Sequence, residues 1–181
     1  MASRQTIAVM VLMGLLLWGC SSVGHPSKVV WTAQPESRVV DNRRLTARIE
    51  PQKGASPFYS FFLLTITNKS DTDLVIDWNA SRYLFNGRPQ GMLVFEGIDP
   101  EKVKTATVPS EAIAPGDGFS RSIMPLRLIA WSPVKDNTAD RRGITPGMLP
   151  GGENGIRLML QHDDGQMTIP LSVRITREES P

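Results

Sequence analysis

The fold of this chain is decided by residues 58–78, FYSFFLLTITNKSDTDLVIDW, in which apolar side chains alternate along two short runs. Successive side chains of a strand point to opposite faces, so each run has one apolar face suited to burial. On that face lie Phe62, Leu64 and Ile66 of the first run and Leu74, Ile76 and Trp78 of the second. The polar residues 68–73 between the runs are of the types that form turns. The stretch therefore predicts two paired strands with a buried side.

Similar patterns extend in both directions from this stretch. Residues 38–50 alternate as a first strand or strand pair, and the Asn86-Gly87 dipeptide predicts a tight hairpin turn. Two strands joined by a turn at 162–165 close the domain, and Pro170 within the second of them should lie at a sheet edge or a bulge. Seven to nine short antiparallel strands without a long helix predict an all-β sandwich, with a small β-barrel as the alternative.

The spacing of these strands resembles that of an immunoglobulin-like domain. The likeness concerns architecture alone, because the Cys-Trp-Cys hallmark is absent. The resemblance implies two packed sheets, with Trp78 in the core between them.

Length and composition indicate one globular domain. The chain has 181 residues, of which 40% are hydrophobic and 21% are charged. This content of hydrophobic residues is sufficient for a core and argues against global disorder. The formal net charge of +2 gives no case for nucleic acid, which requires a concentrated basic face.

Residues 1–19 have the pattern of a secretory signal peptide. Arg4 supplies a basic start, and a continuous apolar run follows from Ile7 to Trp18. That run is shorter than the roughly 20 residues needed to span a bilayer. It ends in Leu17-Trp18-Gly19-Cys20.

This segment resembles a bacterial lipoprotein precursor, whose lipobox has an aliphatic residue at −3, a small residue at −1 and Cys at +1. Leu17, Gly19 and Cys20 match, whereas Trp18 departs from the residues usual at −2. The resemblance implies cleavage between Gly19 and Cys20, and a lipid anchor on Cys20 with a diacylglycerol and a fatty acyl chain such as palmitate. Because Ser21 is not Asp, it also implies sorting to the outer membrane, facing the periplasm. The alternative is an ordinary Cys20 behind an uncleaved anchor.

The sequence divides the remaining chain into three parts. Residues 20–37 are rich in Ser, Pro and Gly and predict a flexible tether of roughly 23 Å after the lipidated Cys. Within it, Val29-Val30-Trp31 should dock on the domain, or else dip into the lipid headgroups. Residues 38–177 form the β-sandwich domain, and residues 178–181 form a polar tail.

No pattern in the sequence indicates catalysis. The only histidines are His25 and His162, too few for a zinc cluster, and no Gly-x-Ser-x-Gly motif is present. Asp163 and Asp164 are adjacent, so they point apart if extended and suit a turn better than acid-base chemistry. The sequence predicts no enzyme, no cofactor and no metal site, although distant strands can still bring catalytic groups together.

The long irregular segment 131–154 is the candidate for partner binding, because loops of this length in compact domains are often functional. An aromatic residue, basic residues and apolar tips suit a contact surface: Trp131, Lys135, Arg141, Arg142, Met148 and Leu149. A passive or packed loop is the alternative. We therefore expect a membrane-anchored envelope lipoprotein that presents a non-enzymatic interaction module to an envelope protein. The alternative function is a periplasmic binding domain for a lipid, a glycan or a metal ion.

Overall fold

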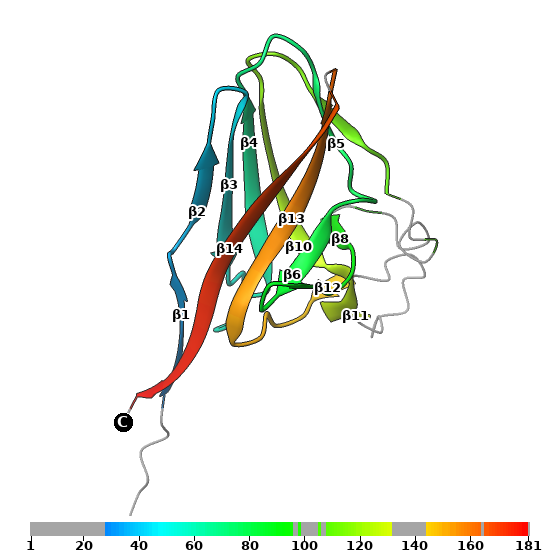
Figure 1. The fold of residues 1–181 in the computed structure, drawn as a ribbon. Helices are drawn as coiled ribbons and strands as arrows, with labels where there is room; N and C mark the ends of the chain where they lie inside the picture. The colour runs from blue at the N-terminus through cyan, green and yellow to red at the C-terminus, as the bar shows by residue number, and fades with distance from the viewer. Residues whose placement is uncertain are drawn as a thin grey trace, which may run out of the picture.

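Two antiparallel β-sheets face each other in the computed structural model, which describes residues 28–95, 98, 105, 108–131, 144–163 and 165–180 (Figure 1). The seven-stranded sheet, named sheet A here, has the order β1-β14-β13-β5-β9, and β6 and β7 extend it beside β13. Its strands are β1 (Lys28–Gln34), β5 (Leu74–Ile76), β6 (Arg82–Phe85), β7 (Arg88–Pro89), β9 (Glu111–Ile113), β13 (Gly152–His162) and β14 (Gly165–Ser180).

The second layer is a five-stranded sheet, named sheet B, with the order β2-β3-β4-β10-β8. Its strands are β2 (Arg38–Asp41), β3 (Leu45–Gln52), β4 (Phe61–Asn68), β8 (Leu93–Phe95) and β10 (Gly118–Pro125). A 3-10 turn η2 (Leu126–Leu128) leads from β10 to a separate pair, β11 (Ile129–Trp131) and β12 (Ile144–Pro146).

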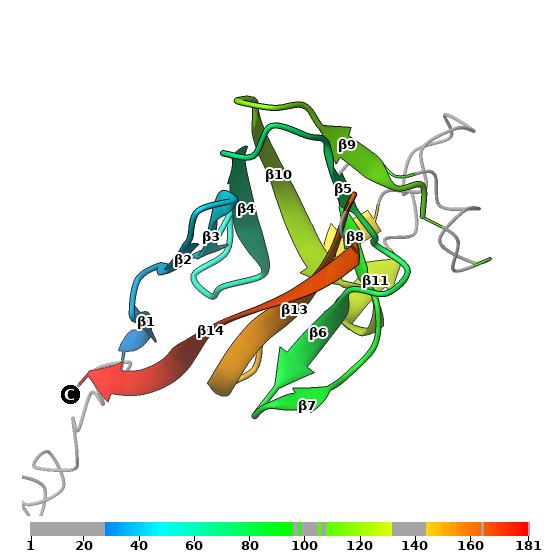
Figure 2. The same cartoon turned by 45° about the horizontal axis from the view of Figure 1, so that its top comes forward.

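Figure 2 shows the two layers from nearer their end, with β14, β13 and β6 in one layer and β3, β4 and β10 in the other. The sheets are separate and do not close into a barrel, so the prediction of an all-β sandwich is confirmed and the barrel alternative is wrong. The described strands outnumber the seven to nine expected, because several strands have only two to four residues.

The core lies between the inner faces of the two sheets. The alternation in the sequence predicted these faces correctly, because every second side chain is buried in β3, in β4 and over residues 154–160 of β13. The fully buried residues include Leu45, Ile49, Phe62, Leu64, Ile66, Leu74, Ile76, Trp78, Ile123, Ile156, Leu158 and Leu160. Burial of this apolar surface is the main term that holds the sheets together.

The predicted pairing within residues 58–78 is wrong. β4 pairs with β3 and β10 in sheet B, whereas β5 pairs with β13 and β9 in sheet A. The polar turn between them therefore crosses from one sheet to the other. Asn68 fixes this crossing, because its buried amide donates to the carbonyls of Thr72 and Ile113, each at 2.8 Å. Its oxygen accepts from the amide of Ser70 at 2.9 Å.

Two other predicted pairings and the predicted turn at Asn86-Gly87 are confirmed. β2 pairs with β3, and β13 pairs with β14 along its whole length. β6 and β7 form the hairpin around Asn86 and Gly87, whose positive φ values of 49° and 74° are those of a tight hairpin turn. Pro170 lies on the side of β14 that no described strand pairs with over residues 165–173, as predicted for an edge proline.

The predicted tether and tail are both shorter than expected. Residues 28–34 of the expected tether form β1, which pairs with the end of β14, and residues 178–180 of the expected tail are part of β14. The cause is burial of Trp31 and Ala33, which are 8% and 6% exposed. The docking of this segment on the domain is thus confirmed.

An inter-sheet cluster closes the sandwich beside β9. The indole of Trp78, which follows β5, donates to Glu111 of β9 at 3.1 Å, and Glu111 forms an ion pair at 2.7 Å with Arg121 of β10. The Arg121 guanidinium also lies 4.4 Å from the ring centre of Phe95 and 5.4 Å from that of Phe119. One cation is therefore held by a carboxylate of sheet A and two aromatic rings of sheet B.

A second buried polar network joins β6 to β13. The Tyr83 hydroxyl donates to Asn154 Oδ1 at 2.5 Å, and Asn154 Nδ2 donates to the carbonyls of Pro150 and Gly152. Burial raises the pKa of Tyr83 to about 12, an effect that the nearby Arg127 partly opposes. The neutral phenol is therefore favoured in the folded state.

We expect folding stability to fall as the pH rises from about 10, the ordinary tyrosine pKa, to about 12. Below this range the phenol is neutral in both states, so its contribution to stability is complete. Alkaline titration of the Tyr59→Phe variant, followed by phenolate absorbance, isolates Tyr83 because the chain has two tyrosines. Titration of the folded variant near pH 10 would contradict the burial described here.

Candidate functional site

The outer face of sheet A is hollowed beside Gly155, where β13 and β14 approach each other closely. Gly155 of β13 lies opposite Ser172 of β14, and a Cβ added to Gly155 would stand 2.3 Å from the carbonyl oxygen of Leu171. Only glycine fits such an approach without moving a strand. The outer surface therefore lacks a side chain at this point of β13.

Two adjoining hollows result, which we name together the outer-face trench. The first has a volume of about 300 Å³ and is lined by Arg38, Leu84, Gly87, Glu153, Gly155, Pro170, Leu171 and Ser172. The second has a volume of about 240 Å³ and is lined by Gln34, Pro35, Glu153, Ser172, Val173 and Arg174. The hollows share Glu153 and Ser172, so the trench crosses sheet A from β6 to the end of β1.

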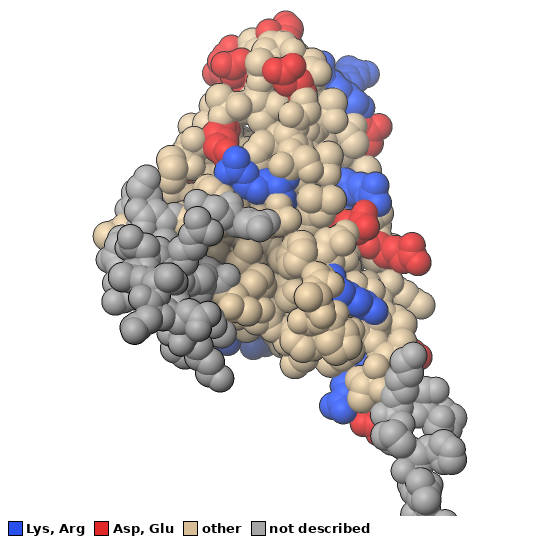
Figure 3. Space-filling model, turned by 180° about the vertical axis from the view of Figure 1, so that it is seen from behind, with Lys and Arg blue, Asp and Glu red and all other residues tan. Residues whose placement is uncertain are grey.

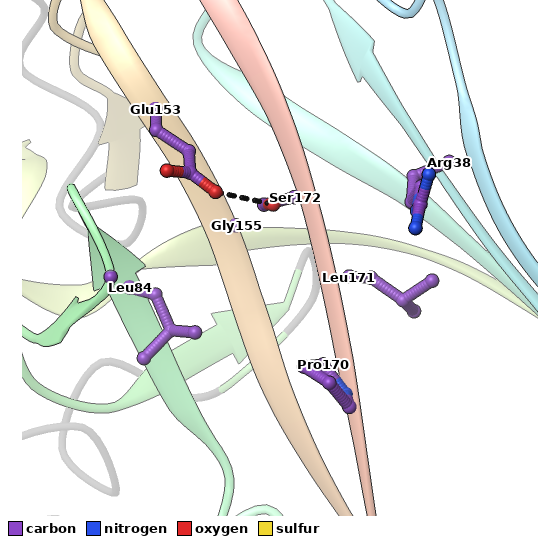
Figure 4. Close-up of a pocket in the computed structure, with 8 residues that line it drawn as sticks. Arg38, Leu84, Glu153, Gly155, Pro170, Leu171 and Ser172 are labelled. Carbon is purple, nitrogen blue, oxygen red and sulfur yellow. Dashed lines mark hydrogen bonds between the residues drawn. The ribbon is translucent and has the colours of Figure 1, made fainter.

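Figure 4 shows how the groups of the first hollow lie: Leu84 comes from β6 on one side, and Arg38 stands beyond β14 on the other. Between them the Ser172 hydroxyl donates to Glu153 Oε1 at 2.7 Å (Figure 4). This bond holds the carboxylate in place across the two strands and leaves its second oxygen directed at the surface.

Two arginines lie on the β14 side of this carboxylate. Arg174 lies directly opposite Glu153 in the strand register, and Arg38 lines the first hollow. Within the described ranges, the side chains of Arg38 and Arg174 have no hydrogen bond and no ion pair. The side chains of the trench thus carry two guanidinium groups with free hydrogen-bond donors and one carboxylate, which gives one more positive charge than negative.

The main-chain groups of Ser172 point along sheet A, toward the edge of β14. The carbonyl of Glu153 accepts from the amide of Asn86, so odd residues of this part of β13 direct their main-chain groups toward β6. In an antiparallel pair, the main-chain groups of two opposed residues are either hydrogen-bonded to each other or both directed away from each other. Ser172, opposite Gly155, therefore directs its N–H and C=O away from β13. β1, whose last pair is Gln34 with Arg174, ends before reaching it.

The predicted contact loop is only partly within the described residues. Lys135, Arg141 and Arg142 lie outside them, and for Trp131 the structure describes the main chain in β11, paired with β12. Met148 is 45% exposed, as a contact residue should be. Leu149 is a correction: it is fully buried and its amide donates to the carbonyl of Tyr59, so it belongs to the core and not to a contact surface.

The other residues that the sequence singled out have structural roles where they are described. The Nε2 atom of His162 lies 2.7 Å from the hydroxyl of Thr72, which joins two turns. Among the described residues, no three His, Cys, Asp or Glu side chains gather in a way that could hold a metal ion. Gly19 and Cys20 lie outside the described residues, so cleavage and lipidation there stay predictions.

The trench was missed in the sequence, although one signal pointed toward it. A glycine inside a strand pattern marks a close approach of another main chain, and Gly155 is such a residue. Arg38 and Arg174 gave no signal, because they lie far apart in the chain and in different sheets, and only the packing of β2 beside β14 brings both to the trench.

Comparisons with known proteins give no relative: no protein-family model matches the chain, and neither does any curated protein. Within the described residues, no helix has both the length and the apolar character needed to cross a membrane.

Proposed function

We propose that this protein is an envelope lipoprotein, anchored through Cys20 in the outer membrane, that presents its β-sandwich in the periplasm as a non-enzymatic interaction module. The sequence supports the anchor through the order of basic start, apolar run and Leu17-Trp18-Gly19-Cys20. The early start of β1 at Lys28 supports a domain held close to that anchor. A residue that carries both a diacylglycerol and a fatty acyl chain has enough lipid for stable membrane attachment.

The observation that carries the interaction role is the outer-face trench. It joins unpaired guanidinium donors and a fixed carboxylate on one exposed sheet face. Polar groups of this kind with apolar walls from Leu84 and Pro170 suit recognition of another molecule. A periplasmic site for a small ligand is the second candidate, because the first hollow reaches the lower limit of about 300 Å³ typical of ligand pockets.

Site-specific photo-crosslinking in bacterial cells tests this function. A photoreactive amino acid replaces Leu84 in the trench, and in a matched control it replaces Thr65, which is on the outer face of sheet B. We expect one dominant envelope-protein adduct from position 84 and none from position 65. The protein should fractionate with the outer membrane, and Cys20→Ser should release it from that membrane.

A deletion tests whether the predicted loop contributes. It must stay within residues 135–142, because a deletion reaching 150 would remove β12 and the buried Leu149. Loss of the adduct in a folded deletion variant would assign part of the contact to the loop. Absence of any protein adduct at position 84 in the membrane-bound protein would contradict the interaction role and favour the small-ligand candidate.

A further inference from the structure

We propose that the outer-face trench binds an extended, acidic peptide segment of a partner protein, about four residues long. This inference rests on the proposed interaction function and names the chemistry that the site selects. It follows from the length of the trench and from its charge.

The length comes from the strand order. The trench crosses β6, β13, β14 and the end of β1, which are neighbours in sheet A. Three intervals between strands of about 4.8 Å each give about 14 Å, and an extended chain rises about 3.3 Å per residue. A segment of about four residues therefore spans the trench from Leu84 to Pro35.

The charge selects carboxylates. Arg38 and Arg174 offer planar guanidinium groups, which bind carboxylates through two parallel hydrogen bonds. Glu153 lies opposite Arg174 but is bonded to Ser172 and pairs with neither arginine. A basic segment would meet two like charges and only one opposite charge, so an acidic segment is favoured.

The length of the trench selects a peptide over a simple anion. A segment of about four residues can place carboxylates along the whole trench, whereas an inorganic phosphate fills only a part of it.

The test measures binding of a dye-labelled tetraglutamate to the full lipidated protein in non-ionic detergent, by fluorescence anisotropy at low salt. We expect tetraglutamate to bind more tightly than tetraserine or tetralysine carrying the same dye. Arg38→Ala and Arg174→Ala should each weaken binding about two- to fivefold, as for exposed ion pairs. Arg43→Ala is the matched control, because it removes the same charge from an exposed turn residue remote from the trench. Thermal melting shows that each variant is folded.

Three outcomes would overturn the inference: equal binding of tetraglutamate and tetraserine, an equal loss in Arg43→Ala, or displacement of tetraglutamate by inorganic phosphate at the same charge concentration. If any of these occurs while the crosslink from position 84 persists, the interaction function stands and only the acidic peptide is wrong. Loss of both the crosslink and the peptide binding would contradict the proposed interaction function as well as the acidic-peptide inference.

Discussion

Replacing Trp78 by Ala should lower the free energy of unfolding by about 3–5 kcal/mol, the range for truncation of a buried aromatic residue. Trp78 is fully buried, and its ring centre lies 5.5 Å from that of Phe95 and 6.2 Å from that of Phe119. Both partners belong to sheet B, whereas Trp78 follows a strand of sheet A. The truncation therefore leaves a cavity where the two layers meet, and it also removes the donor to Glu111.

Urea unfolding followed by circular dichroism measures this loss, with Trp78→Phe as the control. Phenylalanine keeps most of the ring contacts and removes only the indole N–H, so its loss should be clearly smaller. An unchanged unfolding midpoint in Trp78→Ala would mean that the ring is not buried between the sheets.

Replacing Asn154 by Ala should cost about 3 kcal/mol, because a buried polar group left without its partner costs about 1–3 kcal/mol. The change removes the acceptor of the Tyr83 hydroxyl and the donors to the carbonyls of Pro150 and Gly152. Asn154 is fully buried, so water does not readily replace it. The same urea experiment measures the effect.

Tyr83→Phe is the matched control for Asn154. It removes one hydroxyl of the network and keeps both carbonyl contacts of the amide, so its cost should be about 1 kcal/mol. If both variants lose the same stability, the bonds of Asn154 to the 150–152 segment contribute nothing, and the network is a single pair.

The sequence predicted which residues are buried better than which strands are neighbours. The alternation over 58–78 states which face of each run is apolar, and both faces are indeed in the core. It contains no information on whether two apolar faces lie side by side in one sheet or face each other across a sandwich. Asn86-Gly87 succeeded where 68–73 failed, because a two-residue turn forces its flanks together and a six-residue turn does not.

The candidate site depended still more on topology. Leu149 looked like an exposed tip because it follows an irregular segment, yet its burial is decided by a hydrogen bond to the distant Tyr59. The trench residues come from five strands, one hairpin turn and one connection between sheets, so no local pattern identifies them as one site. Only Gly155 and Pro170 could be recognised as unusual from the sequence. A glycine within a strand marks a close approach of another main chain, and a proline cannot donate a hydrogen bond to a neighbouring strand.

The pairing of β1 with β14 determines how far from the lipid each surface can act, if Cys20 carries the proposed anchor. From Cys20 to Lys28 the chain extends at most about 28 Å. β14 has 16 residues and is about 50 Å long. In that case the end of the sandwich remote from the C-terminus, where Figure 3 shows acidic side chains gathered, would lie far from the membrane. The trench begins at the end of β1, about 20 Å beyond Lys28, so a partner must bring its segment to within roughly 50 Å of the same membrane.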